Sequence, residues 1–442
     1  MKKSVTKFSK PLVFLSALML SSCTGGFIGG DSGDNSGIIA GTTIKIMFHV
    51  DSKSAEGIAY KKRVDEFNKQ YKDKYKAAAT FKARTAGAAD YGNELLSLKK
   101  TDSLPSIITF DAPNCHSYAK SGILLDITDL MDTATVSEFV STSTYQNKLY
   151  GLTIQESSAG FFYNKQIFAS AGIDVSAYTV ENPWTFEQFK QVCAKLRTAN
   201  PGNDFTPVDM RLDATKDETA PYLLYSFGHA AGGKFLSDDG LHAQGYLNST
   251  EINRGFSFIK ELYTANYTSY AVGATDFFTG KAGMYLSSGW TIPDLDYKYE
   301  STFGVKDRTK WGVLPYPKDV KAASATGSWC FGLTQNKIED KTGAIELLKF
   351  MTSVESSKAI TDATGMIPAR KSVEDNYEVN SPEYVLRKQL EVSGIERPAT
   401  IGYPQFSTVF NQIISEMKNS DIAGILNTKA ASLESHLAEI NR

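Results

Sequence analysis

The amino-acid sequence predicts an α/β protein with two domains. Short β-branched and apolar segments alternate along the chain with longer segments whose apolar residues recur at helical spacing, a pattern typical of parallel βα units. The stretch from residue 43 to residue 442 is longer than one hydrophobic core usually organises, which indicates two domains of ordinary size. It contains no long apolar run, so we expect the folded part to be soluble.

A secretory leader precedes this folded part. Residues 1–10 carry four lysines and no acidic residue, and residues 11–20 form an apolar stretch too short to anchor the chain across a bilayer. The sequence Leu20-Ser21-Ser22-Cys23 resembles the bacterial lipobox, whose cysteine becomes the lipidated first residue of the mature protein. The resemblance implies a lipoprotein signal peptide over 1–22 and a lipid anchor to the cell membrane at Cys23. An ordinary signal peptide that happens to precede a cysteine is the alternative.

The segment 23–42 is rich in glycine, serine and aspartate, so we expect a flexible tether between the lipid and the folded part. Removal of the leader takes away its four lysines and leaves 43 basic against 49 acidic residues, a net charge near −6. This balance argues against nucleic acid as a partner.

The three other cysteines, Cys115, Cys193 and Cys330, include no C-x-x-C pair and predict neither a disulfide framework nor a zinc site. Cys193 recurs at helical spacing with its apolar neighbours, so we expect it to pack in a core. The sequence leaves open one bridge between Cys115 and Cys330.

Motifs for catalysis, cofactors and metals are missing from the sequence. It contains no H-E-x-x-H, G-x-x-x-x-G-K-[ST], G-x-G-x-x-G or G-x-S-x-G pattern. The five histidines are scattered: His49, His116, His229, His242 and His436. We therefore expect no catalysis, no cofactor and no metal, although two carboxylates for glycoside hydrolysis could come from anywhere in the chain.

The first part of the folded chain reads as alternating strands and helices. β-branched and apolar residues fill the expected strands, and apolar residues recur every three or four positions in the expected helices. In order, these are strand 43–50, helix 59–75, strand 77–84, helix 90–100 and the buried strand 106–111.

In the middle of the chain, a connection over 117–131 leads to 147–157 and 161–172, where a strand and a helix follow closely. The segment 183–198 predicts a helix with Thr185 as N-cap and Trp184 stapling its start. Farther on, we expect a tight turn over 232–240 and a capped helix over 249–267. Next we expect a helix end that leads into a strand over 277–288, and strands over 310–317 and 328–335. The remaining elements are helices 341–353, 356–364, 403–417 and 425–440.

Seven segments, in this order, resemble the family 1 extracellular solute-binding proteins, the group that includes maltose-binding proteins and many oligosaccharide binders. Each segment alone is a loose pattern, but their joint order behind a lipobox is specific. They are LPSIITFDAPNCHSYAKSGILLDITDL, NKLYGLTIQESSAGFFYNKQIFASAGID, PWTFEQFKQVCAKL, GGKFLSDDG, DFFTGKAGMYLSSGW, WGVLPYP and AIELLKFMTSVESSKAITDATGMIPAR.

The resemblance implies a two-lobed periplasmic-binding-protein fold of type II, in which each lobe is a β-sheet flanked by helices and the ligand cleft lies between the lobes. In such proteins the chain passes from one lobe to the other three times, here near 155–157, 327–332 and 365–372. This path predicts an N-terminal lobe of 43–155 plus 330–367 and a C-terminal lobe of 156–329 plus 368–442.

The resemblance also implies a function. We expect an extracytoplasmic, monomeric receptor that captures a sugar or oligosaccharide without catalysis and delivers it to the permease of an ABC importer. One alternative is a two-lobed surface carbohydrate-active enzyme, which would need a carboxyl pair at catalytic separation. The other is a lipoprotein that presents its ligand to a membrane sensor.

Candidate ligand contacts come first from the carboxyl ends of the predicted strands, where open α/β sheets bind ligands. His49 and Asp51 follow the first strand, and Asp111 and Asn114 follow SIITF. A carboxylate can accept hydrogen bonds from two sugar hydroxyls, but Asp111 could equally cap a helix or a turn.

Further candidates come from the resemblance. Glu156 follows the first crossing strand, Trp290 occupies the family's aromatic position after a small-residue turn, and Trp329 lies near the second crossing. Tyr222 and Tyr403 are weaker candidates. No loop with these residues carries clustered lysines or arginines, which favours a neutral carbohydrate over a phosphosugar.

Overall fold

The computed structural model describes residues 43–83, 88–335, 341–373 and 376–442. The predicted lipidation site, Cys23, lies outside these residues. Among the described residues, no helix combines the length and the apolar character that crossing a membrane requires.

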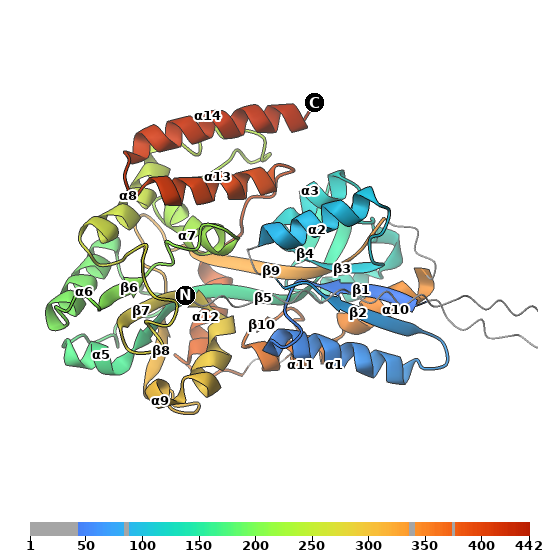
Figure 1. Cartoon of the computed structure of the whole chain (residues 1–442), viewed down its shortest axis with the longest axis horizontal. Helices are drawn as coiled ribbons and strands as arrows, with labels where there is room; N and C mark the ends of the chain where they lie inside the picture. Colours follow the sequence, from blue (N-terminus) through green and yellow to red (C-terminus); the bar gives the residue numbers. More distant parts are fainter. Residues whose placement is uncertain (1–42, 84–87, 336–340, 374–375) are drawn as a thin grey trace, which may run out of the picture. The chain divides into compact units, whose positions relative to one another are not determined.

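A mixed β-sheet forms the centre of the structure (Figure 1). Its main path runs β2 (Lys76–Phe81), β1 (Thr43–Phe48), β3 (Ile107–Asp111), β9 (Ser324–Leu333), β5 (Lys148–Asn164), β7 (Ala282–Ser288) and β6 (Thr206–Asp209). Four shorter strands pair beside this path: β4 (Thr142–Tyr145), β8 (Trp311–Leu314), β10 (Ile367–Pro368) and β11 (Gly394–Ile395).

The predicted parallel βα units are present at both ends of this sheet. Strand β1 pairs in parallel with β2 and β3, and β6 pairs in parallel with β7. Between them, β5 and β9 are antiparallel to each other and to their other neighbours on the main path. The alternation of strands and helices did not indicate these antiparallel pairs, because each pair joins strands that lie far apart in the sequence.

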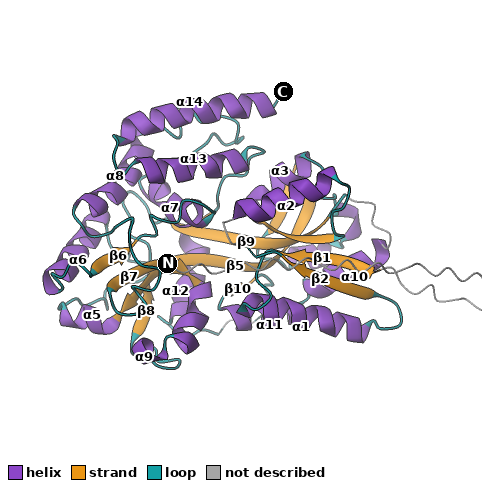
Figure 2. Ribbon diagram, in the orientation of Figure 1, coloured by secondary structure: helices purple, strands orange, loops and turns teal. Residues whose placement is uncertain are grey.

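The two long strands join the halves of the sheet (Figure 2). The segment 152–158 of β5 pairs with 326–331 of β9, while 159–163 of β5 pairs with β7. The residues that follow β1 and β3 on one side, and β6 and β7 on the other, therefore flank a pair of crossing strands.

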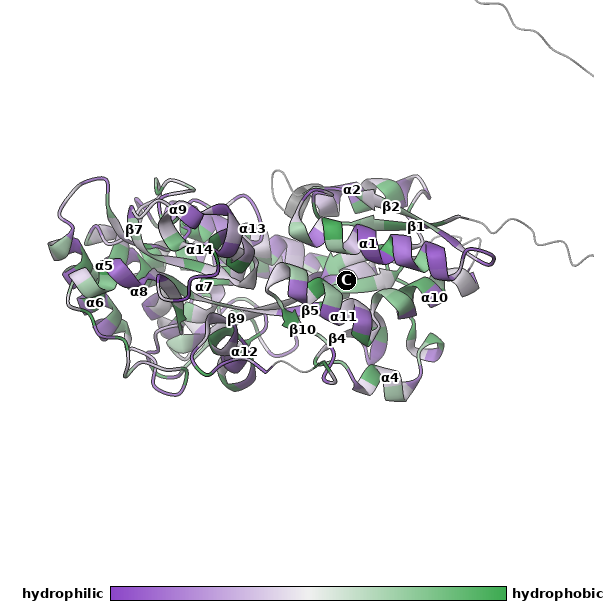
Figure 3. Cartoon of the chain, turned by 90° about the horizontal axis from the view of Figure 1, so that it is seen from below, coloured by the Kyte–Doolittle hydropathy of each residue, from purple (hydrophilic) through white to green (hydrophobic). Residues whose placement is uncertain are grey.

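Helices cover the sheet on both faces. The α-helices are, in chain order, α1 (Ala55–Gln70), α2 (Ala88–Lys100), α3 (Cys115–Lys120), α4 (Thr133–Ser137), α5 (Lys165–Ser170), α6 (Phe186–Ala199), α7 (Thr219–Ala230), α8 (Thr250–Thr264), α9 (Glu300–Phe303), α10 (Lys341–Met351), α11 (Val354–Thr364), α12 (Pro382–Ser393), α13 (Tyr403–Glu416) and α14 (Ile422–Ile440). In Figure 1, α1 and α11 lie on the face of β1 opposite to α2 and α3. Figure 3 shows hydrophilic residues along much of α1, and the buried residues of this helix include Tyr60, Val64 and Phe67.

The capping pattern predicted for α6 is confirmed. Thr185 accepts a hydrogen bond from the backbone N–H of Gln188, whose side chain accepts one from the N–H of Thr185, a reciprocal capping box. The indole of Trp184 is buried against Tyr178 and Phe189, which confirms a structural role at the start of this helix.

The buried hydrophobic residues form separate clusters in the two halves. One cluster packs α1, α10 and α11 against β1 and the first part of β5, and another packs α2 and α3 against β3. In the other half, the largest cluster joins α6, α7, α8, α13 and α14. Cys193 lies in this largest cluster, which confirms its predicted core position, and Cys115, Cys193 and Cys330 are all buried free thiols.

A histidine and a glutamate fasten the loop before α8 to α14. His242 Nδ1 lies 2.8 Å from Glu434 Oε1, and Glu434 Oε2 accepts hydrogen bonds from the backbone N–H groups of Ala243 and Gln244. The hydrogen bond to Glu434 raises the pKa of His242 above its ordinary value. A raised pKa in the folded state means that the charged imidazole stabilises the fold at low pH and that this contribution disappears as pH rises.

We therefore expect His242→Gln to lower the melting temperature more at about pH 5.5 than at about pH 8.5. Thermal denaturation of both proteins at the two pH values measures this difference. His436→Gln, a histidine substitution on α14, is the control. Equal losses for His242→Gln at both pH values would show that the imidazolium does not contribute.

Candidate functional site

An aromatic stack lies at the carboxyl ends of β1 and β3. His49, which is 1% exposed, follows β1. Its imidazole stacks on the indole of Trp329 from β9, with 3.3 Å between the ring centroids and 4° between the ring planes. The His49 backbone N–H donates to Thr109 Oγ1 at 3.1 Å, and its Nε2 lies 3.6 Å from Glu56 Oε1. These contacts fix the imidazole and present an indole beside the two strand ends.

A row of buried polar side chains continues along the crossing strands. Gln155 Nε2 donates to Glu56 Oε1 at 3.0 Å. Two residues later on β5, Ser157 donates to the carbonyl of Gly327 at 2.8 Å and accepts from the Tyr222 hydroxyl at 2.9 Å. Because successive side chains alternate along a strand, Gln155 and Ser157 share one face of β5.

A second aromatic pair lies beside Ser157, to which the Tyr222 hydroxyl donates. Tyr222, on the first turn of α7, lies 5.6 Å from Trp290, which follows β7 in the short 3-10 helix Gly289–Thr291. Tyr222 is buried, whereas Trp290 is 43% exposed, an unusual exposure for an indole. An exposed indole beside a fixed tyrosine provides an apolar platform with hydrogen-bonding groups at its edge.

A buried ionic network joins β3 to α7 and α13. Arg397, whose side chain is 4% exposed, donates to both carboxylate oxygens of Asp111 at 2.7 and 2.8 Å and to Glu218 at 2.9 Å. The Tyr403 hydroxyl accepts from Arg397 at 3.0 Å and donates to Glu218 at 2.5 Å, and Ser407 also donates to Glu218. Burial raises the pKa of Glu218, and the Arg397 guanidinium opposes that rise.

Arg397 also connects this network to the aromatic pair. Its guanidinium carbon lies 5.4 Å from the centre of the Tyr222 ring. Asp111 pairs with Trp329 in the β3–β9 register. Ring contacts, strand pairing and the contacts of Arg397 together link six of the predicted site residues: His49, Trp329, Asp111, Tyr403, Tyr222 and Trp290.

Three predicted site residues lie apart from this chain of contacts. Asp51 is exposed and accepts the backbone N–H of Lys53 in the turn before α1. Asn114 ends a short 3-10 helix before α3 and makes no side-chain capping bond there. Glu156 is buried and accepts from Ser141, and burial raises its pKa to about 7. As the neighbour of Gln155 on β5, Glu156 points to the opposite face.

Several residues of the site were missed by the sequence analysis. Arg397 and Glu218 lie far from Asp111 in the chain, and no motif marks them. Gln155 and Ser157 flank a predicted residue, so the period of two along a strand was the available signal.

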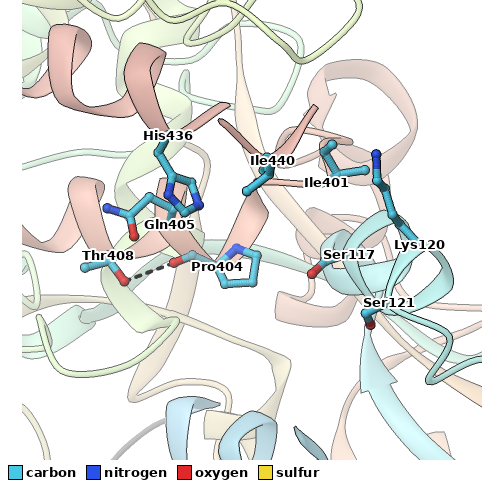
Figure 4. Close-up of a pocket in the computed structure, with 10 residues that line it drawn as sticks. Ser117, Lys120, Ser121, Ile401, Pro404, Gln405, Thr408, His436 and Ile440 are labelled. Carbon is cyan, nitrogen blue, oxygen red and sulfur yellow. Dashed lines mark hydrogen bonds between the residues drawn. The ribbon is translucent and has the colours of Figure 1, made fainter. Parts of the chain in front are cut away.

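Two cavities adjoin the ionic network. The smaller, about 150 Å³, lies beside Arg397 and is lined by Pro113, His116 and 326–328 among others. The larger, about 420 Å³, lies between α3 and the start of α13, where Gly402 and Pro404 flank Tyr403 (Figure 4). Among the described residues, no group of three or more His, Cys, Asp or Glu side chains is placed to hold a metal ion.

Comparison with known proteins gives the following similarities. A family model described as bacterial extracellular solute-binding protein matches residues 62–386. A protein of Brucella abortus (strain 2308), named as a binding protein, is 26% identical over 260 residues, which cover 56% of this chain and 57% of that protein. The matched region thus spans little more than half the length of this curated relative.

Two solved structures resemble the chain over nearly all of their own length. The GacH receptor of Streptomyces glaucescens GLA.O, solved unliganded and with acarbose, has a TM-score of 0.73 at 17% identity, covering 90% of this chain and 98% of the receptor. An ABC transporter solute-binding protein of Thermotoga lettingae TMO, solved with α-D-tagatose, has a TM-score of 0.75 at 18% identity, covering 89% of this chain and 99% of that one. At these identities the likeness shows the fold, and the predicted two-lobed α/β class is confirmed.

Proposed function

The chain belongs to the bacterial extracellular solute-binding proteins, and we propose that it captures a sugar or oligosaccharide and delivers it to the permease of an ABC importer. The ligand lies between an N-terminal lobe of 43–155 plus 330–367 and a C-terminal lobe of 156–329 plus 368–442. The sugar ligands named for the acarbose-bound and tagatose-bound structures support this ligand class.

The exposed indole of Trp290 beside buried Tyr222 is the observation that carries the proposal. Flat rings stack on the apolar faces of sugar rings, and the hydroxyl and amide groups around them bind sugar hydroxyls. Trp329 supplies a second ring, held by His49 at 3.3 Å. By the proposed bounds both indoles belong to the C-terminal lobe, and His49 of the N-terminal lobe packs against Trp329.

Closure of the two lobes over the ligand is the proposed signal to the importer. A sugar hydroxyl loses water when it is buried, so burial is favourable only when hydrogen-bonding partners from both lobes are in place. The permease then recognises the closed form. Asp111 and Tyr403 act in this scheme through Arg397, which they hold between β3 and α13.

An acylated Cys23 is proposed to keep the receptor at the outer side of the cell membrane. The lipobox pattern before Cys23 supports this localisation. Metabolic labelling with a fatty-acid analogue should mark the wild-type protein and not Cys23→Ser. Labelling of neither protein would contradict the anchor.

A thermal-shift screen of neutral mono- and oligosaccharides tests the proposed function. A ligand that binds the native state raises the melting temperature, by an amount that grows with ligand concentration relative to Kd. We expect at least one neutral sugar to raise the melting temperature of the purified full chain. A complete panel without any shift would contradict sugar binding.

Replacement of Trp290 with alanine should remove most of the shift produced by that sugar. Stacking of a sugar on an indole depends on the whole ring, so we expect the affinity for the sugar to fall at least about tenfold, or about 1.4 kcal/mol. Titration calorimetry measures the change. Tyr297→Ala removes a more exposed aromatic ring from the same region and is the matched control, which should bind as the wild type does.

A further inference from the structure

Asp209 is a buried carboxylate at the carboxyl end of β6. It is 5% exposed, and one of its oxygens accepts the backbone N–H of Arg211 at 2.8 Å. Within the described part of the chain, its other oxygen accepts no hydrogen bond. Burial raises the pKa of Asp209 to about 6. That second oxygen is not among the fully buried unpaired polar atoms, so it can accept a hydrogen bond from a ligand.

Arg211 adds a donor beside this carboxylate. Its guanidinium donates to the Tyr285 hydroxyl at 2.6 Å and lies 5.4 Å from the centre of that ring. Among the described residues, no carboxylate lies within 4.0 Å of this guanidinium, so most of its five N–H groups have no protein acceptor. The backbone of Arg211 has φ +57°, the left-handed region that an arginine rarely adopts.

Both residues lie at the same sheet edge as the aromatic pair. Strands β6 and β7 are parallel, and Asp209 pairs with Tyr285. Arg211 follows β6 by two residues, as Trp290 follows β7 by two residues. The loop that begins at Arg211 ends at Glu218, in the ionic network, where α7 begins. This loop therefore runs across the strand ends from the edge of the sheet to the site.

On the basis of the proposed function, we propose that Asp209 and Arg211 form a further sugar subsite that binds two neighbouring hydroxyls of a neutral sugar. One hydroxyl oxygen accepts from the Arg211 guanidinium, and the adjacent hydroxyl donates to the spare oxygen of Asp209. The carboxylates of Asp213 and Asp217 also act on Arg211. The three acidic residues outnumber the one guanidinium, so the local charge is net negative and the subsite selects neutral sugars over sugar phosphates and uronic acids.

The left-handed backbone makes Arg211→Gly an informative variant. Glycine adopts φ +57° without a steric penalty, so the variant removes the guanidinium and relieves the backbone. If Arg211 serves the ligand, the melting temperature of the ligand-free variant stays the same or rises while binding weakens. If Arg211 serves the fold through Tyr285, its loss lowers the melting temperature.

The experiment measures thermal shifts of the purified full chain, Arg211→Gly and Asp209→Asn with D-glucose, D-tagatose, maltose and maltotetraose, and with glucose 6-phosphate and glucuronate. For any neutral sugar that shifts the wild type, we expect at least a tenfold loss of affinity in both variants and no larger shift from the anionic analogues. Unchanged affinity in both variants, a lower ligand-free melting temperature of Arg211→Gly, or a preference for the anions would overturn the subsite and leave the proposed function standing. The absence of any shift in the wild type would overturn sugar binding itself.

Discussion

Replacement of Arg397 with methionine is expected to lower the free energy of unfolding by about 3–5 kcal/mol, because it leaves two buried carboxylates without their cation. Arg397 forms a bidentate pair with Asp111 and a further pair with Glu218, and its side chain is 4% exposed. Methionine fills much of the same volume, so the loss reports the charge and not a cavity. Urea denaturation at neutral pH measures it.

Arg308 offers a matched control for this prediction. It also bridges two acidic residues, Asp296 and Glu383, but the Arg308 side chain is 34% exposed and that of Glu383 is 23% exposed, so water compensates part of the charge when the guanidinium is removed. We expect Arg308→Met to be clearly less destabilising than Arg397→Met. Equal losses for the two variants would show that burial of the Arg397 network does not determine its contribution.

Replacement of Glu156 with glutamine is expected to make the protein more stable at pH 8 and to leave its stability at low pH nearly unchanged. Burial raises the pKa of Glu156 from 4.5 to about 7. Between these values the folded state binds more protons than the unfolded state, so the free energy of unfolding of the wild type falls as pH rises. At 1.36 kcal/mol for each pKa unit, the fall amounts to about 3 kcal/mol, and glutamine avoids it.

Urea denaturation of the wild type and Glu156→Gln at pH 4.5 and at pH 8 measures this difference. Glutamine still offers an oxygen to the Ser141 hydroxyl, so the variant keeps the only hydrogen bond described for Glu156 between side chains. Parallel pH profiles for the two proteins would show that Glu156 ionises in the folded state as it does in the unfolded chain.

The elements with a clear period were predictable from the sequence. The run 43–50 gives β1, because β-branched and apolar residues fill it. The capped pattern after Thr185 gives α6, because one face of this helix is buried and the other is not. Helix α7 was not predicted, since nearly all of its residues are buried and no apolar stripe stands out. Strand β6 has four residues, too few for a period to appear.

The candidate site was predictable only where a strand end or the family resemblance marked it. His49 and Asp111 followed from the carboxyl ends of parallel strands, and Trp290 and Trp329 followed from the resemblance. Arg397 lies 286 residues from Asp111 in the chain, and a pair at such separation leaves no local pattern. Asp209 ends the short strand β6 and Arg211 follows it, and both were missed because this strand was missed.

The proposed sugar site thus depends on aromatic side chains whose positions are fixed by buried polar contacts. Trp290 packs against Tyr222, which donates to Ser157 on β5, and Trp329 packs against His49, which is bonded to Thr109 on β3. Preorganised rings of this kind lose little conformational freedom when a ligand binds.

Tryptophan fluorescence during a sugar titration tests the central claim most directly. The chain has four tryptophans, and Trp184 and Trp311 are buried in hydrophobic cores away from the site. With a sugar that raises the melting temperature, we predict a saturable change in emission that Trp290→Phe and Trp329→Phe together abolish. Saturable binding of that sugar with unchanged emission of the wild type would contradict a site built on these two indoles.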